Sequence, residues 1–504
     1  MQIKINENEY WWGISVSEGT ALPLGRDDNA ILPINGRGNG DQYAPFLLSS
    51  EGRYVYGEKP FSAEIANGVI TLDIDDGLDI SEGHGDLRGA YLAACKKHFP
   101  FTGELPDEDF FRVPQYNTWI ELGTEQTSEN ILRYAHGRID HGLPAGVLMI
   151  DGGWQEDYGT FEFNRRKVPD PKAMMDELHS LGFKVMVWVS PIVASAGTQF
   201  KMLRGKGYLC RDEKGEIAIR KWWSGYSAVL DLTNPEAVEW YHGQLRFLMD
   251  EYGVDGFKFD AGDRSFYNDT DKIAIPSPAR VQTRYFNIVG EKYKLNEFRA
   301  AYDFGGHAIV SRLHDKDHSW VTHGLNALIP NTLMQGLLGY AYCCPDMVGG
   351  GEINCFNGGK PLDEELFVRW AQANALMGML QMSAAPWRVL NEKNAGLVLE
   401  AIKLHAKFGD RFLELARNAA KTGEPITRHM EYVFPHCGYA KINDQFMLGS
   451  DILVAPVIKK GETERDVVLP EGRWESEQGE IFDGGQTINI KVPIERIPYF
   501  RKIG

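Results

Sequence analysis

The feature that most constrains this chain is an alternation, from Gln115 to about residue 395, of short apolar runs with longer segments of helical periodicity. This alternation is the pattern of parallel βα units. Eight candidate strands follow one another along the chain: Tyr116–Leu122, Val147–Asp151, Lys184–Val189, Gly256–Asp260, Phe298–Tyr302, Ala308–Leu313, Ala341–Pro345 and Met377–Met382. Eight is the strand number of a (β/α)8 TIM barrel, so we predict an α/β fold with this barrel at its centre.

Sequence rich in β-forming residues flanks the barrel on both sides. Short runs broken by Gly, Asn and Asp precede it, and similar runs follow a helical stretch near Leu397–Leu415. Each flank is typical of an antiparallel β-sandwich. The predicted units are an N-terminal β-sandwich (1–100), a connector (101–114), the barrel (115–395) and a helix with a C-terminal β-sandwich (396–504). Ser195–Leu232 is too long for an ordinary βα loop and is expected to form a small excursion.

Composition excludes several classes of function. The chain has 53 Lys and Arg against 70 Asp and Glu, a net charge of −17, which disfavours binding to nucleic acid. Met1–Tyr10 does not resemble a secretory signal, and no run approaches the ~20 apolar residues of a membrane span. The six cysteines lack CxxC spacing and a companion cluster of His residues. We therefore expect a cytoplasmic protein with reduced cysteines, no bound metal and no membrane association.

Reactive residues of a TIM barrel lie at the carboxyl ends of its strands. The run Val254–Asp263 places Asp260 at such an end, with Lys258 two residues before it. Period-two alternation directs both side chains into the barrel, where an unpaired charge would be costly. A lone Asp at a strand end is more often a helix cap. The nearby Lys favours a site, because a cation stabilises the ionised carboxylate that a nucleophile requires.

Other strand ends carry acids and aromatic residues. Ser311–Trp320 contains Arg312, Asp315 and Asp317, and Asp151 is followed by two glycines and Trp154. Trp222-Trp223 and Pro386-Trp387 lie near further predicted barrel loops. Such tryptophans are more often core residues, yet several around one barrel mouth would suit sugar stacking. Two carboxylates with aromatic walls make glycoside hydrolysis the best chemical fit, with Asp260 attacking the anomeric carbon.

These motifs resemble family 31 of the glycoside hydrolases over nearly the full chain. The resemblance is carried by Phe257–Asp260, Arg312–Asp315 with Trp320, Trp223–Gly225, Asp231–Pro235, Cys344–Gly350, Gly449–Val457 and Val468–Trp474. It implies a retaining enzyme without an organic cofactor, in which Asp260 is the nucleophile. The family acid/base precedes a Trp by five positions, which implies Asp315, with Asp317 as the second choice. A family Arg sixteen residues before that acid implies Arg299 as a sugar ligand.

Departures from the family pattern concern the choice of sugar. Family α-glucosidases carry Trp at the position of Lys258, and their late barrel His is replaced near Ser383. Lys-x-Asp at the nucleophile and Asp-Gly-Gly-Trp at Asp151 resemble motifs of α-galactosidases, whose Lys and acids bind the axial 4-hydroxyl. The resemblance therefore implies an exo-acting α-galactosidase. The substrate-binding set that we predict is Asp151, Trp154, Trp188, Trp223, Lys258, Arg299, Arg312, Asp346 and Trp387.

Several alternatives stay open at this point. Within the class, the chain could be an α-glucosidase, an α-xylosidase or an N-acetyl-α-galactosaminidase. From another class comes a catalytically silent carbohydrate-binding protein, against which the presence of both Asp260 and Asp315 argues. The expected partner is a small-molecule α-galactoside or oligosaccharide, and the sequence leaves open a homo-oligomer whose second copy contributes to the aglycone side.

Overall fold

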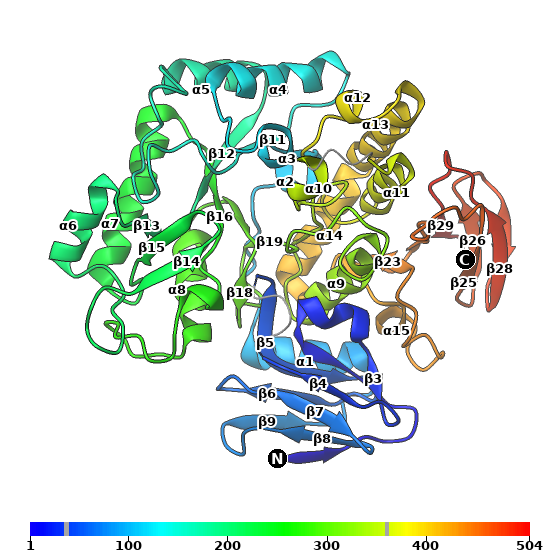
Figure 1. The fold of residues 1–504 in the computed structure, drawn as a ribbon. Coiled ribbons are helices and arrows are strands. Elements are labelled where there is room, and N and C mark those ends of the chain that lie inside the picture. The colour runs from blue at the N-terminus through cyan, green and yellow to red at the C-terminus, as the bar shows by residue number, and fades with distance from the viewer. Residues whose placement is uncertain (35–39, 358–361) are drawn as a thin grey trace.

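The predicted barrel is present. The computed structural model describes residues 1–34, 40–357 and 362–504, and eight parallel strands form its central sheet (Figure 1). In barrel order they are β10 (Gln115–Asn117), β11 (Val147–Ile150), β12 (Lys184–Val189), β16 (Gly256–Phe259), β17 (Leu295–Phe298), β19 (Val310–Arg312), β20 (Cys343–Cys344) and β21 (Gln381–Met382). β21 pairs with β10. At the seam between β20 and β21, the Val348 amide donates to Gln381 O at 2.9 Å, so the barrel is nearly closed.

The longer helices cover the outside of the barrel. They are α4 (Ser128–Asp140), α5 (Pro171–Ser180), α7 (Pro235–Phe247), α8 (Ala279–Glu291), α9 (Leu325–Leu337) and α11 (Glu364–Asn374). Three four-residue helices lie in the loops that follow β10, β20 and β21: α3 (Trp119–Leu122), α10 (Asn354–Asn357) and α12 (Pro386–Val389). Asp170, Asn234 and Asp363 cap α5, α7 and α11 by accepting a hydrogen bond from a first-turn amide. In the described part of the chain, every helix is too short or too polar to span a bilayer.

An N-terminal pair of antiparallel sheets packs beside the barrel. One sheet has the order β1 (Gln2–Lys4), β8 (Val69–Leu72), β7 (Ala63–Ala66), β4 (Ala30–Leu32). The other has the order β3 (Leu24–Gly25), β2 (Tyr10–Ser15), β5 (Gln42–Ser49), β6 (Tyr54–Gly57), β9 (Leu78–Ser81). α1 (Leu87–His98) and α2 (Asp109–Arg112) lead from these sheets to the barrel.

Two of the predicted strands are wrong in detail. The run Phe298–Tyr302 is not one barrel strand: the barrel strand β17 ends at Phe298, and Ala301–Tyr302 form β18, which pairs with β5 of the N-terminal sheet. The run Tyr116–Leu122 is a strand only to Asn117, after which α3 begins. Both breaks fall within runs rich in apolar residues, and the hydrophobic pattern alone does not mark where a buried chain changes partner.

The predicted excursion and the C-terminal sandwich are both present. The excursion contains β13 (Ile192–Ala194), α6 (Thr198–Lys206), β14 (Ile219–Trp222) and β15 (Gly225–Val229). Figure 1 shows it on the side of the barrel opposite the C-terminal sheets. After α13 (Glu392–Lys407) and α14 (Gly409–Thr422), one sheet has the order β22 (Thr427–Arg428), β23 (Phe446–Leu448), β24 (Ile452–Val454), β29 (Tyr499–Lys502), β26 (Arg473–Ser476), β27 (Ile481–Asp483). The second sheet pairs β25 (Glu464–Leu469) with β28 (Gln486–Lys491).

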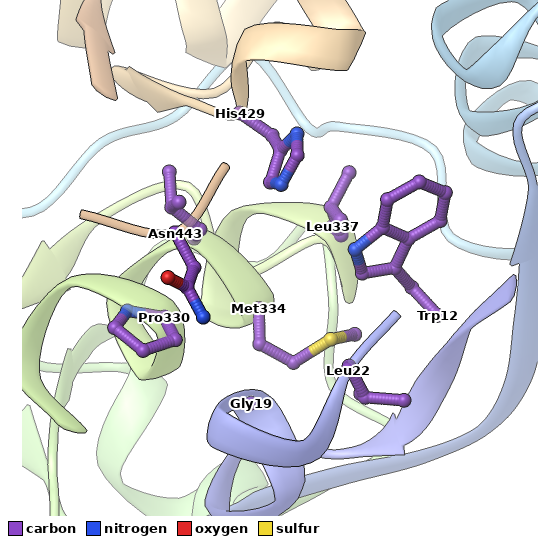
Figure 2. Close-up of a pocket in the computed structure, with 9 residues that line it drawn as sticks. Trp12, Gly19, Leu22, Pro330, Met334, Leu337, His429 and Asn443 are labelled. Carbon is purple, nitrogen blue, oxygen red and sulfur yellow. The ribbon is translucent and has the colours of Figure 1, made fainter. Parts of the chain in front are cut away.

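The three units meet at one small pocket. Figure 2 shows Trp12 of the N-terminal sheet and His429, which precedes α15 (Met430–Val433), near each other beside the side chains of Leu337 and Met334 from α9. The two rings make an edge contact with centroids 5.4 Å apart. Gly19, in the 3₁₀ helix Val16–Ala21, lies against α9 so closely that a Cβ there would be 2.7 Å from Pro330 O. This junction therefore requires a glycine for steric reasons.

We expect Gly19→Ala to destabilise the protein by about 1–3 kcal/mol, because the added methyl group would meet backbone atoms that cannot move aside. Gly396→Ala is the matched control, since Gly396 lies in α13 with open space around its Cβ position. The control should raise stability by about 0.5–1 kcal/mol through helix propensity. Thermal unfolding of both variants measures the difference. Equal melting temperatures for the two variants would contradict the steric argument.

Candidate active site

Asp260 lies at the carboxyl end of β16 and is held by three donors. Its Oδ1 accepts from Arg299 Nε at 2.7 Å and from the Ala261 amide at 2.8 Å, and its Oδ2 accepts from Trp188 Nε1 at 2.8 Å. Burial acts to raise the pKa of this carboxyl, but Arg299 and Lys258 outweigh burial and hold the pKa well below its usual range. The side chain is 13% exposed, so the ionised carboxylate is partly accessible at the carboxyl end of the barrel.

The local chain explains why Asp260 points there. Along β16, Lys258 and Asp260 share one face of the strand, as the period of two requires. Directly afterwards, Ala261 and Gly262 take φ values of +56° and +70°, so the chain turns sharply out of the barrel. Positive φ at a residue other than glycine is strained, and such strain is concentrated at functional sites.

Lys258 and Asp151 form the second charged pair. The Lys258 Nζ donates to Asp151 Oδ2 at 2.6 Å, and the two side chains are only 4% and 5% exposed. Burial alone would lower the pKa of Lys258, yet Asp151 raises it above its usual value, so the amine stays charged. The structure therefore brings these two candidate sugar-binding residues into direct contact.

Arg312 is the centre of the third charged group. Its Nη1 donates to Asp315 Oδ1 at 2.8 Å and to Asp346 Oδ1 at 2.9 Å, and its Nε lies 3.3 Å from Glu297 Oε1. Asp346 also accepts from the amides of Lys316 and Gly351, at 2.6 and 2.8 Å. Three carboxylates therefore surround one buried guanidinium.

The carboxyls around Arg312 titrate differently. Burial, then the charge of Asp315, raises the pKa of Asp346 to about 7. Burial and the charge of Asp260 act to raise the pKa of Asp315, but Arg312 outweighs them and the pKa lies below its usual value. Because Asp315 and Asp346 share one nitrogen of Arg312, they titrate as a pair. Burial also raises the pKa of Glu297.

Asp315, and not Asp317, belongs to this group. Asp315 is 31% exposed while bonded to Arg312, so part of its carboxyl is accessible. Asp317 lies on the exposed loop two residues further, where its amide donates to His323 O. Arg312 and Asp346 are 1% and 0% exposed, so they hold Asp315 from behind and present no surface to a sugar.

Arg299 and Trp223 lie toward the mouth. Arg299 Nη2 bonds Asp263 Oδ2 at 2.9 Å, and its Cζ lies 5.9 Å from the ring of Trp223. Trp223, at the tip of the β14–β15 hairpin, is 59% exposed and packs against Trp222 and Phe266. Trp223 therefore offers a free aromatic face beside the charged residues.

Two tryptophans that we expected in the substrate-binding set are elsewhere. Trp154 is fully buried, donates its Nε1 to Trp188 O at 2.8 Å and packs on Phe163, so it supports Trp188 from below. Trp387 stacks on His141 at 3.7 Å, at the end of α4 outside the barrel. The placement of both as sugar walls is corrected: each fills space in the core or between helices, which is the commoner role of Trp.

Sequence reasoning missed Glu297, Asp263 and Gln381. Glu297 stands two residues before Arg299, so strand alternation could have placed it on the inner face of β17. Gln381 donates to Glu297 Oε2 at 2.6 Å from the last barrel strand. In the described ranges, His, Cys, Asp and Glu form no group of three suited to a metal ion.

Comparison with known proteins places this geometry in a family. The model of the "Glycosyl hydrolases family 31 TIM-barrel domain" matches residues 115–408, and that of the family's C-terminal domain matches residues 423–504. The chain is 33% identical over 426 residues to the mouse "Myogenesis-regulating glycosidase", covering 82% of this chain and 60% of the relative. It is 25% identical over 475 residues to "Alpha-xylosidase XylQ" of Lactiplantibacillus pentosus, covering 87% of this chain and 59% of that protein.

Solved structures share the fold. A family 31 α-xylosidase from a soil metagenome, solved with xylose, superposes with a TM-score of 0.86 at 22% identity over 99% of this chain and 79% of that chain. The chain spans about 60% of the length of the two curated relatives. The two family models together cover most of the chain, including every charged residue described above. The chain therefore belongs to family 31 of the glycosyl hydrolases.

Proposed function

We propose that this glycosyl hydrolase is a retaining, exo-acting α-galactosidase. The observation that carries the proposal is the position of Lys258, paired with Asp151, on the same strand face as Asp260 and two residues deeper. In an α-galactoside the axial 4-hydroxyl points to the ring face opposite the departing group. That is the face from which a nucleophile attacks C1, so a cation beside the nucleophile is well placed for this hydroxyl.

The 4-hydroxyl of glucose is equatorial and points away from that face, and xylose shares the glucose configuration at C4. A charged donor and a charged acceptor side by side can bond both the oxygen and the proton of one axial hydroxyl. Relatives of this chain named as α-xylosidases and α-glucosidases are 25–26% identical to it. The sugar assignment therefore rests on Lys258 and Asp151.

In the proposed reaction Asp260 attacks C1. Among the described residues its Oδ1 accepts two hydrogen bonds and its Oδ2 one, so Oδ2 has a lone pair to form the C1–O bond. Asp315 gives its proton to the glycosidic oxygen as the C1–O bond to the aglycone breaks. Asp315 then takes a proton from water, which attacks C1, releases Asp260 and yields the sugar with retained configuration.

Azide rescue should distinguish the role of Asp260 from that of Asp315. Asp260→Asn removes the nucleophile, and we expect turnover of an aryl α-galactoside to fall by about 10⁴-fold or more. In Asp315→Ala, azide should restore turnover of an activated aryl galactoside and give the α-galactosyl azide, because azide needs no base to attack the glycosyl-enzyme. Nuclear magnetic resonance of the azide product measures this. Near-normal hydrolysis by Asp260→Asn would exclude the mechanism.

Lys258→Met should lower kcat/KM for an aryl α-galactoside by about 10–100-fold, since a hydrogen bond to a charged group contributes about 1.5–3 kcal/mol. The wild type should lose a similar factor on the aryl 4-deoxy-α-galactoside, whereas the variant should lose little more on it. Initial rates on these substrates and on aryl α-glucoside, α-xyloside and N-acetyl-α-galactosaminide complete the measurement.

Lys184→Met is the matched control for Lys258→Met. It also removes an ion pair, with Asp107 at 2.7 Å, but at the start of β12, at the other end of the barrel. We expect unchanged sugar preference in this control. A wild-type preference for glucoside or xyloside would refute the galactoside assignment and leave the hydrolase intact.

The dependence of kcat/KM on pH should report the protonation of the Asp315–Asp346 pair. Since the pKa of Asp346 is raised to about 7 and the pair shares Arg312, kcat/KM should fall as the pH rises above about 7, where the pair loses the proton that Asp315 must donate. Asp346→Asn removes a negative charge beside Asp315, which favours its ionised form. The alkaline limb should therefore move to lower pH.

Asp263→Asn, which removes a carboxylate bonded to Arg299 and not to Arg312, should leave the alkaline limb where it is. The measurement is kcat/KM against pH for the three proteins, with thermal melts to confirm that each is folded. An alkaline limb at the same pH in Asp346→Asn would show that the pair does not set the proton of the acid.

A further inference from the structure

The two barrel strands that carry the key arginines separate just where the arginines begin. β17 and β19 pair in parallel, with the register Glu297↔Val310 and Phe298↔Ser311. The next pair of that ladder would be Arg299 and Arg312, but after Arg299 the chain leaves the barrel to form β18. Figure 1 shows β18 beside β5 of the N-terminal sheet, with which it pairs. The backbone pairing of β17 with β19 therefore ends one residue pair before Arg299 and Arg312, which bind the carboxylates of Asp260 and Asp315.

Gln42 is the first residue of β5 in the N-terminal sandwich, and its side chain links the two barrel strands at the position where their next backbone pair would form. Its Nε2 donates to Arg299 O at 2.6 Å and to Arg312 O at 2.9 Å. Its Oε1 accepts from Gln335 Nε2 at 2.8 Å, and that nitrogen also donates to Ser311 O at 2.9 Å. Gln42 is fully buried, and both protons and the oxygen of its amide are used.

The residues just before Gln42 contact the same two segments. Asp41 Oδ1 accepts from the amide of His314, next to Asp315, at 2.8 Å. Gly40 O accepts from Arg299 Nη1 at 3.3 Å, and a Cβ at Gly40 would lie 1.7 Å from that nitrogen. Residues 40–42 of the N-terminal sandwich therefore bind both the Arg299 side and the Asp315 side of the site.

We propose that Gln42 is a positioning residue for hydrolysis: it fixes the spacing between the ends of β17 and β19, and with it the placement of Asp260 on Arg299 relative to Asp315 on Arg312. This inference rests on the double-displacement mechanism proposed above, though not on the choice of sugar. A side-chain amide that bonds two backbone carbonyls at once has little freedom to let the strands part. Misplacement of a catalytic group by about 1 Å can cost about 10²-fold in rate.

The test compares Gln42→Met with Gln445→Met. Gln445 is also a buried glutamine that bonds backbone, to Val468 O at 2.8 Å and from the Val468 amide at 3.0 Å, but it lies in the C-terminal sandwich. Both substitutions keep the side-chain volume and remove the amide. Steady-state kinetics use two aryl glycosides of the same sugar, one with a dinitrophenyl group that departs without a proton and one with a poor leaving group.

For Gln42→Met we expect kcat/KM on the poor leaving group to fall by about 10–100-fold, with a fall of less than about threefold on the dinitrophenyl substrate. The value of kcat/KM reports the steps up to formation of the glycosyl-enzyme, and in those steps only the poor leaving group requires Asp315 at the glycosidic oxygen. Gln445→Met should change both rates by the same small factor. A loss that is equal on both substrates in Gln42→Met, or unchanged rates, would overturn the proposal, since a merely structural role changes only the amount of folded enzyme.

Gln42→Glu provides a second variant if Gln42→Met does not fold. A carboxyl beside two carbonyls keeps its proton and donates one of the two bonds, so its effect should lie between those of wild type and Gln42→Met, again larger for the poor leaving group. Equal effects on both substrates would again exclude positioning. If the wild type hydrolyses an α-glucoside and not an α-galactoside, the sugar assignment fails and the same comparison proceeds on the glucoside.

Discussion

Buried charge is the constraint on which the site depends. The side chains of Lys258, Arg299 and Arg312 are 4%, 6% and 1% exposed, toward the carboxyl ends of three neighbouring barrel strands. A buried cation that loses its partner costs several kcal/mol, so each must be bonded to a carboxylate. The pairs that result are Lys258–Asp151, Arg299–Asp260 and Arg312–Asp315. Two of the three carboxylates belong to the candidate nucleophile and the candidate acid/base. The ion pairs that offset the cost of burying the three cations therefore also hold these two carboxylates in position.

The site holds more carboxyl groups than cations, and the acids differ in protonation as a result. Asp260, next to Arg299 and Lys258, stays ionised and suits nucleophilic attack. Asp315 and Asp346 share one nitrogen of Arg312. Burial raises the pKa of Asp346 to about 7, whereas the pKa of Asp315 is lowered, so below about pH 7 the pair holds one proton, chiefly on Asp346. The acids thus differ in protonation because they share their cations differently, and in the proposed retaining mechanism the proton of the Asp315–Asp346 pair is the one that Asp315 passes to the leaving group.

The sequence predicted what periodicity and strand ends reveal. Alternation of apolar and helical segments predicted the barrel. The strand-end positions predicted Asp260 with Lys258 as a site and marked Asp151 as a further candidate. Family spacing added Arg299 and Asp315. Trp154 and Trp387 were misplaced because a Trp near a strand end has the same sequence signal whether it faces a pocket or packs against a helix. Glu297 carried a signal, its spacing of two from Arg299, but an interior acid is recognisable only once its partner Arg312 is known.

The role of the N-terminal sandwich had no signal in the sequence at all. Gln42 is an ordinary polar residue at the start of a strand, and its partners Arg299 and Arg312 are 257 and 270 residues away. β18 could not be told from a barrel strand, since both are short, apolar and buried. β18 follows the barrel strand β17 directly along the chain and pairs with β5, so one short stretch of chain joins the barrel to the N-terminal sheet. The sandwich is then a wall of the site, and relative movement of the two units would change the distance between the catalytic carboxylates.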